Sequence, residues 1–180
     1  MMRILQRLER TDGAEIAEVA LVLPLVFMFL MGIVWFGRAF NIYSTITHAA
    51  EQGAMVAARP TCGTCIQPAD QWGSTNFPGD TTVQDSVFSV LRSSSLDPSQ
   101  IVVYFPSVIS CPLPAPPGNC STTGNNITIC RSVVLNPTGT VPQCGSIVSF
   151  QYPFQMNLPF TSLNLQQIVL KAQAQNRMEN

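Results

Sequence analysis

The cysteines are the first residues to examine for chemistry, because Cys62-Gly-Thr-Cys65 has the C-x-x-C spacing of thioredoxin-like redox sites. In those sites a helix N-terminus stabilises the reactive thiolate. Here the pair instead follows Pro60, which is predicted to end a helix, and no βαβ pattern comes after it. A structural disulfide is therefore the preferred interpretation. An envelope thiol–disulfide protein that uses Cys62 and Cys65 is kept as an alternative.

Other catalytic groups are scarce. His48 is the only histidine and Lys171 the only lysine, and the acidic residues are scattered along the chain. His48 is one candidate base, but no obvious Ser or Cys nucleophile and no Cys pair lies near it in sequence, and no Gly-rich phosphate-binding loop is present. We therefore expect no enzymatic activity, no cofactor and no metal. The net charge of -1 provides no basic surface for nucleic acid.

An acidic residue, Glu18, stands directly before the most apolar stretch of the chain. Residues Val19 to Gly37 include no charged side chain. Nineteen residues at a rise of about 1.5 Å nearly match a hydrocarbon core of about 30 Å. The sequence therefore predicts one transmembrane helix over about 17–37, with a local kink where Pro24 removes a helical N–H. A buried core helix and a cleaved secretory signal are the weaker alternatives.

Short-range charge predicts the orientation of this span. Arg3, Arg7 and Arg10 precede the span, whereas only Arg38 follows it within twenty residues. By the positive-inside rule the N-terminus stays in the cytoplasm and the rest of the chain is exported. A single-pass protein of a bacterial inner membrane, with a periplasmic or extracytoplasmic C-terminal domain, is expected.

Cysteine usage agrees with export, because all six cysteines follow the span and an even number suggests disulfides in an oxidising compartment. The six residues are Cys62, Cys65, Cys111, Cys120, Cys130 and Cys144. A bond between Cys111 and Cys120 would close a Pro-rich loop, and one between Cys130 and Cys144 would tie two adjacent strands. Six cysteines allow fifteen connectivities, so other pairings stay open.

The N-terminus resembles a pilin-type leader. A short basic segment ends at Gly13, and Glu18 follows five residues later, which is the Gly-xxxx-Glu arrangement on which prepilin peptidases act. The resemblance implies cleavage between Gly13 and Ala14 by such a peptidase. It also implies that Glu18 meets the N-terminal amine of a neighbouring subunit and sets register. The local alternative is that Glu15 and Glu18 only offset a helix dipole.

The resemblance extends to a specific family, since Gly13 to Ala58 is similar to the N-terminal signature of TadE-like proteins. The matching elements, in chain order, are Glu18, Ala20-Leu21-Val22-Leu23-Pro24, Gly32, Phe36-Gly37-Arg38, Tyr43, Thr47 and Ala49-Ala50-Glu51-Gln52-Gly53-Ala54. Val19 departs from the pattern, where the family usually has a larger residue.

This family resemblance implies a non-enzymatic pseudopilin of a tight-adherence (Flp-type) pilus or a related secretion system. Helix bundling would involve Glu18, Pro24 and Gly32. The implied partners are membrane lipid, the prepilin peptidase, other pseudopilins, the major pilin and the inner-membrane pilus platform with its ATPase. An anchored, exported binding module without a pilus role is the alternative.

Beyond the span, small residues recur at helical spacing. They predict a stalk helix that continues to Pro60. The face consists of Ala39, Tyr43, Ile46, Ala50, Gly53 and Ala57. Packing of this face on the chain's own sheet is preferred, with packing on another chain as the alternative. A glycine costs a helix about 1 kcal/mol, so Gly53 is expected to mark a close contact.

The remaining pattern predicts one short helix and several strands. Thr81 to Arg92 forms an amphipathic helix with Asp80 as its cap, and Val83, Val87, Val90 and Leu91 share one face. Strands are expected at Ile101–Phe105, Ile127–Leu135, Val148–Phe154 and Ile168–Gln175, with a surface loop over Val108–Asn126.

The predicted fold class is α+β: a transmembrane helix extended as a stalk, then a small exported domain with about four antiparallel strands and both helices against one face. The expected organisation is a cytoplasmic leader over 1–13, a transmembrane and stalk helix over 14–59, and the exported domain over 60–180.

Overall fold

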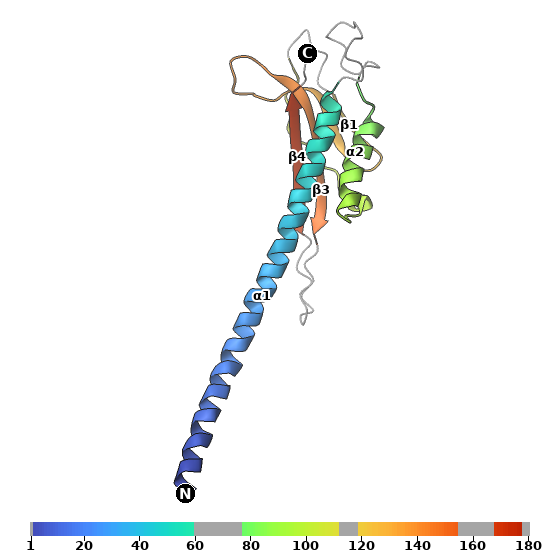
Figure 1. The fold of residues 1–180 in the computed structure, drawn as a ribbon. Helices are drawn as coiled ribbons and strands as arrows, with labels where there is room; N and C mark the ends of the chain where they lie inside the picture. The colour runs from blue at the N-terminus through green and yellow to red at the C-terminus, as the bar shows by residue number, and fades with distance from the viewer. Residues whose placement is uncertain (1, 60–76, 112–118, 155–167, 178–180) are drawn as a thin grey trace. The chain divides into compact units, whose positions relative to one another are not determined.

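The structure is a computed structural model that describes residues 2–59, 77–111, 119–154 and 168–177, with only the backbone described for residues 2–14 (Figure 1). The chain divides into two compact units, Met1–Phe40 and Asn41–Asn180. The first unit is helical where it is described. The second contains the end of that helix, a second helix and a sheet.

Helix α1 (Met2–Ala58) runs through both units without interruption and contains Pro24. Large apolar side chains prevail in its first part, and alanines prevail in the last part, where they suit close packing. The helix ends at Ala58, two positions before Pro60 in the sequence. This agrees with the predicted stop, because the residue that precedes a proline disfavours the helical conformation.

Four antiparallel strands form one sheet in the order β1-β2-β3-β4. They are β1 (Asn119–Thr122), β2 (Thr128–Val134), β3 (Cys144–Phe154) and β4 (Ile168–Arg177). The predicted α+β class with a four-stranded antiparallel sheet is confirmed. The three C-terminal strands were predicted, and β3 begins four residues earlier than expected.

The predicted strand at Ile101–Phe105 is wrong. Only Val102 pairs there, in an isolated bridge with Gln151 of β3. β2 pairs with β3 as far as Ser149, and beyond that point Val102 makes one bridge before the chain leaves this edge. The segment instead crosses the face of the sheet away from the helices, where the Ser149 hydroxyl donates to the carbonyl of Tyr104 at 3.0 Å.

The predicted surface loop over Val108–Asn126 is also wrong in part, because it contains β1. This strand has only four residues, Asn-Cys-Ser-Thr, and most of it is exposed. Such a short polar strand lacks the apolar alternation that identifies strands in a sequence. Its pairing with β2, in register from Asn119↔Arg131 to Thr122↔Thr128, holds it in the sheet.

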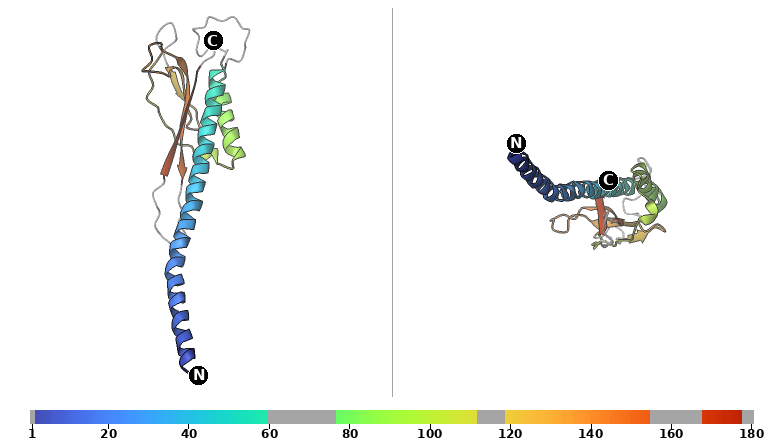
Figure 2. Two further views of the ribbon diagram at one scale, coloured as in Figure 1. Left: turned by 60° about the vertical axis from the view of Figure 1, so that its left-hand side comes forward. Right: turned by 90° about the horizontal axis from the view of Figure 1, so that it is seen from below.

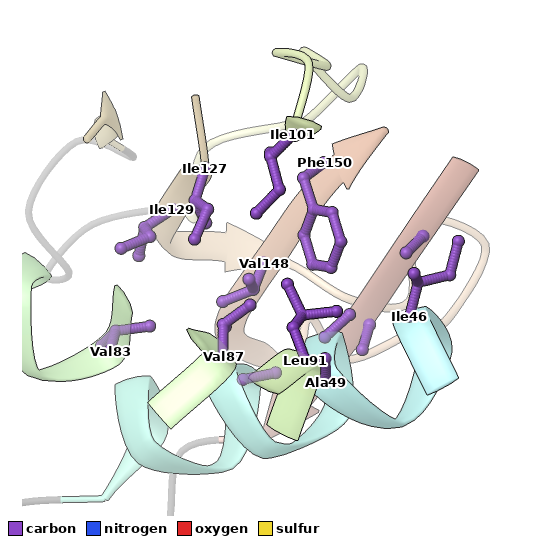
Figure 3. Packing of buried hydrophobic residues seen from close by; sticks show 14 of the residues in the cluster. Ile46, Ala49, Val83, Val87, Leu91, Ile101, Ile127, Ile129, Val148 and Phe150 are labelled. Carbon is purple, nitrogen blue, oxygen red and sulfur yellow. The ribbon is translucent and has the colours of Figure 1, made fainter. Parts of the chain in front are cut away.

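The main core lies between the helices and one face of the sheet (Figures 2 and 3). Within the second unit, α1 contributes Ile46 and several alanines, and α2 (Asp80–Ser93) contributes Val83, Val87 and Leu91. Alternate β3 residues, Val148 and Phe150, meet them from the sheet.

The predicted stalk face therefore packs on the chain's own sheet, as preferred from the sequence. Ile46, Ala50, Gly53 and Ala57 are buried, whereas Tyr43 is exposed. On α2, Phe88 is buried in addition to the predicted face, and Val90 is only partly buried.

A smaller cluster fills the opposite face of the sheet. Cys130, Val133 and Ile147 are buried there, with Val108 and Leu135 packed against them. Val108 belongs to the segment that crosses this face. Both faces are thus partly covered, and the 101–111 segment acts as a second layer without forming a named strand.

Gly53 marks the closest approach of α1 to its neighbours. A Cβ atom there would lie 2.7 Å from Cγ2 of Val87 and 3.3 Å from Cγ1 of Val148. Both neighbours are β-branched side chains with restricted χ1 rotation, so they have little freedom to move aside. The expected close contact is confirmed, and it lies at the meeting point of α1, α2 and β3.

We predict that Gly53→Leu destabilises the second unit by about 1–3 kcal/mol or more, because the added carbons overpack a filled core. Leucine has a higher helix propensity than glycine, so a loss of stability in this variant cannot come from helix propensity. Thermal unfolding of the detergent-solubilised chain, followed by circular dichroism, measures the change. Ser44→Leu, on the exposed side of α1, is the control and should leave the midpoint nearly unchanged. Equal midpoints for both variants would contradict this packing.

Candidate functional site

The first candidate site is the exposed apolar part of α1. The aliphatic and phenylalanine side chains from Ile16 to Phe36 are all exposed, from 38% for Met31 to 77% for Met28. This helix is long and apolar enough to cross a membrane, and none of its most apolar window is buried. Burial is worth about 25 cal/mol per Å² of apolar surface, so a covering of lipid or of other helices is strongly favoured.

Glu18 lies exposed at the beginning of this apolar segment. Helical periodicity puts Leu25, Gly32 and Phe36 on the same side of the helix as Glu18. Leu25, Phe29, Gly32 and Phe36 also line a shallow apolar hollow on that side. Nothing lies within 4 Å of a Cβ built on Gly32, so this side of the helix is open.

The predicted processing residues lie on the same helix. Gly13 and Ala14 have helical backbone, and only the backbone is described at these two positions. Among the described residues Glu18 has no ion pair. Near the other end of the apolar segment, the Arg38 guanidinium lies 5.8 Å from the centroid of the Trp35 ring. Such a pair suits the boundary between lipid and water.

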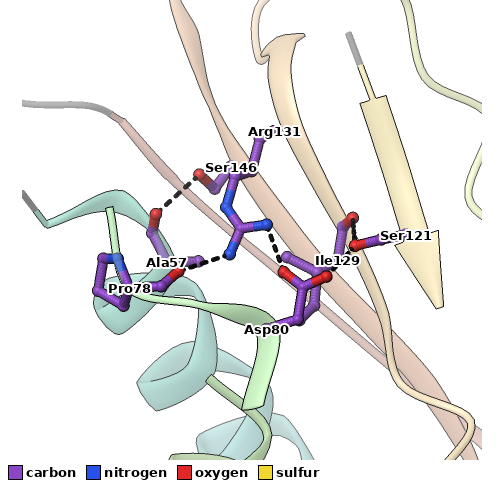
Figure 4. Close-up of polar contacts among 7 residues, drawn as sticks. All are labelled: Ala57, Pro78, Asp80, Ser121, Ile129, Arg131 and Ser146. Atoms are coloured by element: carbon purple, nitrogen blue, oxygen red, sulfur yellow. Dashed lines mark hydrogen bonds and ion pairs between the residues drawn. The ribbon is translucent and has the colours of Figure 1, made fainter. Parts of the chain in front are cut away.

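The second candidate feature is a polar network in the folded unit (Figure 4). Arg131 of β2 pairs with Asp80 at the start of α2, and it also donates to the carbonyl of Pro78 at 2.9 Å. The hydroxyl of Ser121 on β1 donates to the second Asp80 oxygen at 2.6 Å. Nearby, the Ser146 hydroxyl on β3 donates to the carbonyl of Ala57, at the end of α1.

This network corrects the predicted role of Asp80. The N-cap of α2 is Gly79, which makes no side-chain cap bond, and Asp80 is the first helical residue. Burial alone would raise the pKa of Asp80, but the hydrogen bonds from Ser121 and Arg131 and the charge of Arg131 outweigh it and hold the pKa below its ordinary value. Asp80 therefore binds α2 to the sheet instead of capping the helix.

Two disulfides are present among the described residues. Cys111 bonds Cys144, and Cys120 bonds Cys130. Disulfide bonding of the part that follows the apolar span is thus confirmed, but the two pairings suggested from the sequence, Cys111 with Cys120 and Cys130 with Cys144, are wrong. The register explains the outcome, since Cys120 and Cys130 are direct partners in the β1–β2 ladder. Cys62 and Cys65 lie outside the described residues.

Groups suited to catalysis do not gather in the described part of the chain. No cluster of three or more His, Cys, Asp or Glu side chains that could hold a metal occurs there. His48 is exposed on α1. The residues that the structure brings together pack the core or hold its segments to one another. The exposed apolar part of α1 is the feature that requires a partner.

Comparison with known proteins also points to helix α1. The family model described as TadE-like protein matches residues 13–55. Residues 13–55 are a TadE-like segment. The resemblance predicted from the sequence is confirmed, and the match supports a general association with tight-adherence pilus systems. No curated protein and no solved structure matches the chain.

The TadE-like segment contains Gly13, Glu18, the apolar span and most of the α1 face that packs on the sheet. It ends three residues before α1 does. The Asp80–Arg131 pair and both disulfides lie beyond it. Sequence reasoning did not find that ion pair, because 51 residues separate its members and no local pattern joins them.

We predict that Asp80→Asn makes the folded unit less stable by about 1 kcal/mol above pH 5, a modest value because the pair is partly exposed to solvent. The folded-state pKa lies below the ordinary value of 3.8, so the contribution of Asp80 is complete above that value and is lost as the pH falls through the lower pKa. Chemical denaturation at several pH values measures both effects.

The control for this prediction is Asp85→Asn, an exposed position on the same helix. It should keep the wild-type loss of stability in acid, whereas Asp80→Asn should show a smaller loss. If the two variants have the same pH profile, the pair does not hold α2 to the sheet.

We predict that a non-reducing digest analysed by mass spectrometry yields the Cys111–Cys144 and Cys120–Cys130 peptides. Loss of the first bond should be the more destabilising, because it spans 33 residues in sequence against 10 for the second. Loop-closure entropy gives about 4 kcal/mol for the longer loop and about 3 kcal/mol for the shorter. Two variants, each with both cysteines of one bond replaced by alanine, test which bond contributes more to stability. A digest with Cys111 joined to Cys120 would contradict the register of β1.

Proposed function

We propose that this protein is a TadE-like pseudopilin, a membrane-anchored structural component that helps to assemble a tight-adherence pilus or a related secretion system. One observation carries the proposal. The exposed apolar part of α1 follows Gly13, Ala14 and Glu18 in pilin-type spacing, and the same helix ends in a folded, disulfide-bonded unit. Such a chain combines an anchor that can bundle in lipid with a unit that can meet partners outside it.

The proposed location is a bacterial inner membrane, crossed once. Arg3, Arg7 and Arg10 keep the N-terminus in the cytoplasm, since positive charge is retained on that side. The folded unit then lies in the periplasm. The two disulfides support this side of the membrane, because they form and persist in oxidising compartments.

The proposed mechanism of assembly rests on Glu18. A charged side chain at the centre of a membrane helix costs about 2.5–3.5 kcal/mol, and less near the interface, so a partner of opposite charge is favoured. Cleavage between Gly13 and Ala14 by a prepilin peptidase would create a free amine on each subunit. The amine of one subunit would pair with Glu18 of the next, which fixes their axial offset while the apolar helices pack.

The side of the helix that includes Gly32 suits this packing. Lipid provides no hydrophobic drive between helices, so association depends on close contact, and small residues permit it. Gly32 is open and lies in the apolar hollow on the Glu18 side. The partners proposed from the family are the prepilin peptidase, the major pilin, related pseudopilins and the membrane platform with its ATPase.

We predict that the mature chain isolated from membranes begins at Ala14 and that Glu18→Ala leaves its membrane level unchanged while it reduces pilus assembly about tenfold or more. The physical reason is the lost ion pair that sets the axial offset. N-terminal sequencing and shear-released pilus yield are the measurements. Glu15→Ala is the matched control, since Glu15 is also exposed but lies outside the Gly-xxxx-Glu spacing, and its yield should equal that of the wild type.

Two results would oppose the proposal. A chain that keeps Met1 or Met2 would indicate an anchored binding module with no pilus role. Normal pili in Glu18→Ala would remove the register function from that carboxylate.

A further inference from the structure

The two edges of the sheet differ in how they are protected. The β1 edge is short, with four residues, and Cys120 ties it to Cys130. Beyond Asn119, the first residue of β1, Ser110 pairs with Val133 and covers more of the β2 edge. The other edge is β4, which pairs with β3 over ten residues without a register shift. In the described part of the chain no strand lies on its outer side (Figure 1).

The hydrogen bonds of Val102 reveal which β4 residues face outward. Val102 and Gln151 exchange both backbone bonds, at 2.9 and 2.8 Å, so the N–H and C=O of Gln151 point away from β4. Its partner across the ladder, Lys171, therefore also directs its N–H and C=O away from β3. The same holds for every second residue of the strand. The outward set is Val169, Lys171, Gln173, Gln175 and Arg177.

These outward groups form an open ladder. No backbone hydrogen bond joins them to another segment within the described residues. Proteins usually blunt such an edge with proline, a bulge, a very short strand or charged side chains, and of these β4 has only the charges of Lys171 and Arg177. At its start, Ile168 and Val169 are 46% and 43% exposed although both are apolar. An incoming strand would cover both features.

The side chains of the outward residues define the chemistry of the partner. Alternate residues share one face, so Lys171 and Arg177 lie on the same face of the sheet, six residues or about 20 Å apart. The neighbouring strand β3 includes no charged residue, and the whole sequence from 132 to 170 has none. The Lys171 ammonium is held 4.9 Å from the Tyr104 ring centroid, which fixes one cation in place.

We propose that the outer edge of β4 binds an extended segment of another protein as an added antiparallel strand. The segment would place two acidic side chains, six residues apart, opposite Lys171 and Arg177, and an apolar residue against Val169. A second copy of β4 fits less well, because Ile168–Arg177 has no acidic residue. This inference is independent of the pilus role, since it uses only the folded unit.

The test uses the full chain in detergent micelles and a fluorescent eleven-residue peptide of Val and Thr, with Glu at its second and eighth positions, opposite Arg177 and Lys171, and Val at its tenth, opposite Val169. Each Glu would face an outward β4 residue, so the even peptide residues direct their N–H groups to β4. Methylation of the even peptide nitrogens should weaken binding about tenfold or more, because ladder bonds are lost. Methylation of the odd nitrogens should leave affinity nearly unchanged. Replacement of both Glu by Lys should also weaken binding.

Matched variants of the protein also test whether the outward backbone groups of β4 bind the peptide. Gln173→Pro removes an outward N–H and no bond to β3, so it should reduce affinity about tenfold, whereas Gln173→Ala should not. Thermal unfolding checks that both variants fold. If the proline variant does not fold, binding of the methylated peptides to the wild-type chain tests the proposal instead. Equal binding of both methylated peptides would overturn the proposal. So would a dimer in sedimentation that Gln173→Pro makes monomeric, since a second copy would then fill the edge.

Discussion

The close approach of α1 to the sheet through Gly53 and its neighbouring alanines is the contact on which the folded unit depends. Ala49, Ala50, Ala54 and Ala57 are buried beside Gly53, and their small size lets β3 and α2 reach the helix backbone. Large side chains on α2 and β3, such as Leu91 and Phe150, fill the space that remains. A single helix thus belongs to two environments: its first part leaves large apolar groups uncovered, and its last part contributes almost only small ones to a core.

The folded unit is then fastened at places where hydrophobic packing alone would be weak. The N-terminal end of α2 has no side-chain cap, and the ion pair of Asp80 with Arg131 anchors that end to β2. The Cys120–Cys130 bond secures a strand of only four residues. The Cys111–Cys144 bond joins the end of the crossing segment to the start of β3. These tethers lie at segment ends, where fraying begins.

Much of the architecture was predictable because it follows from local pattern. The apolar run after Glu18, the small residues before Pro60 and the alternation at Val148–Phe154 each determine an element with few competitors. The strand predicted at Ile101–Phe105 failed for a non-local reason: its composition suits a strand, but after the Val102 bridge the chain crosses the face of the sheet, where the Ser149 hydroxyl donates to the Tyr104 carbonyl. The disulfide partners failed likewise, since the neighbour of Cys120 is known only once the β1–β2 register is known. The role of Glu18 stays a prediction, because it rests on sequence spacing and on partners outside this chain.

The open edge of β4 and the exposed side of α1 complement each other in physical terms. Helices in lipid gain little hydrophobic energy from pairing, so the apolar segment can pack with many similar helices and discriminates poorly among them. Charge and directional hydrogen bonds discriminate better, because an unmatched polar group is costly where water is excluded. On the helix such discrimination would come from Glu18. On the folded unit it would come from the outward backbone of β4, with Lys171 and Arg177 as the charged positions. Selection of partners by this chain would therefore depend on a few polar groups, and the exposed apolar side chains would add affinity without selecting among partners.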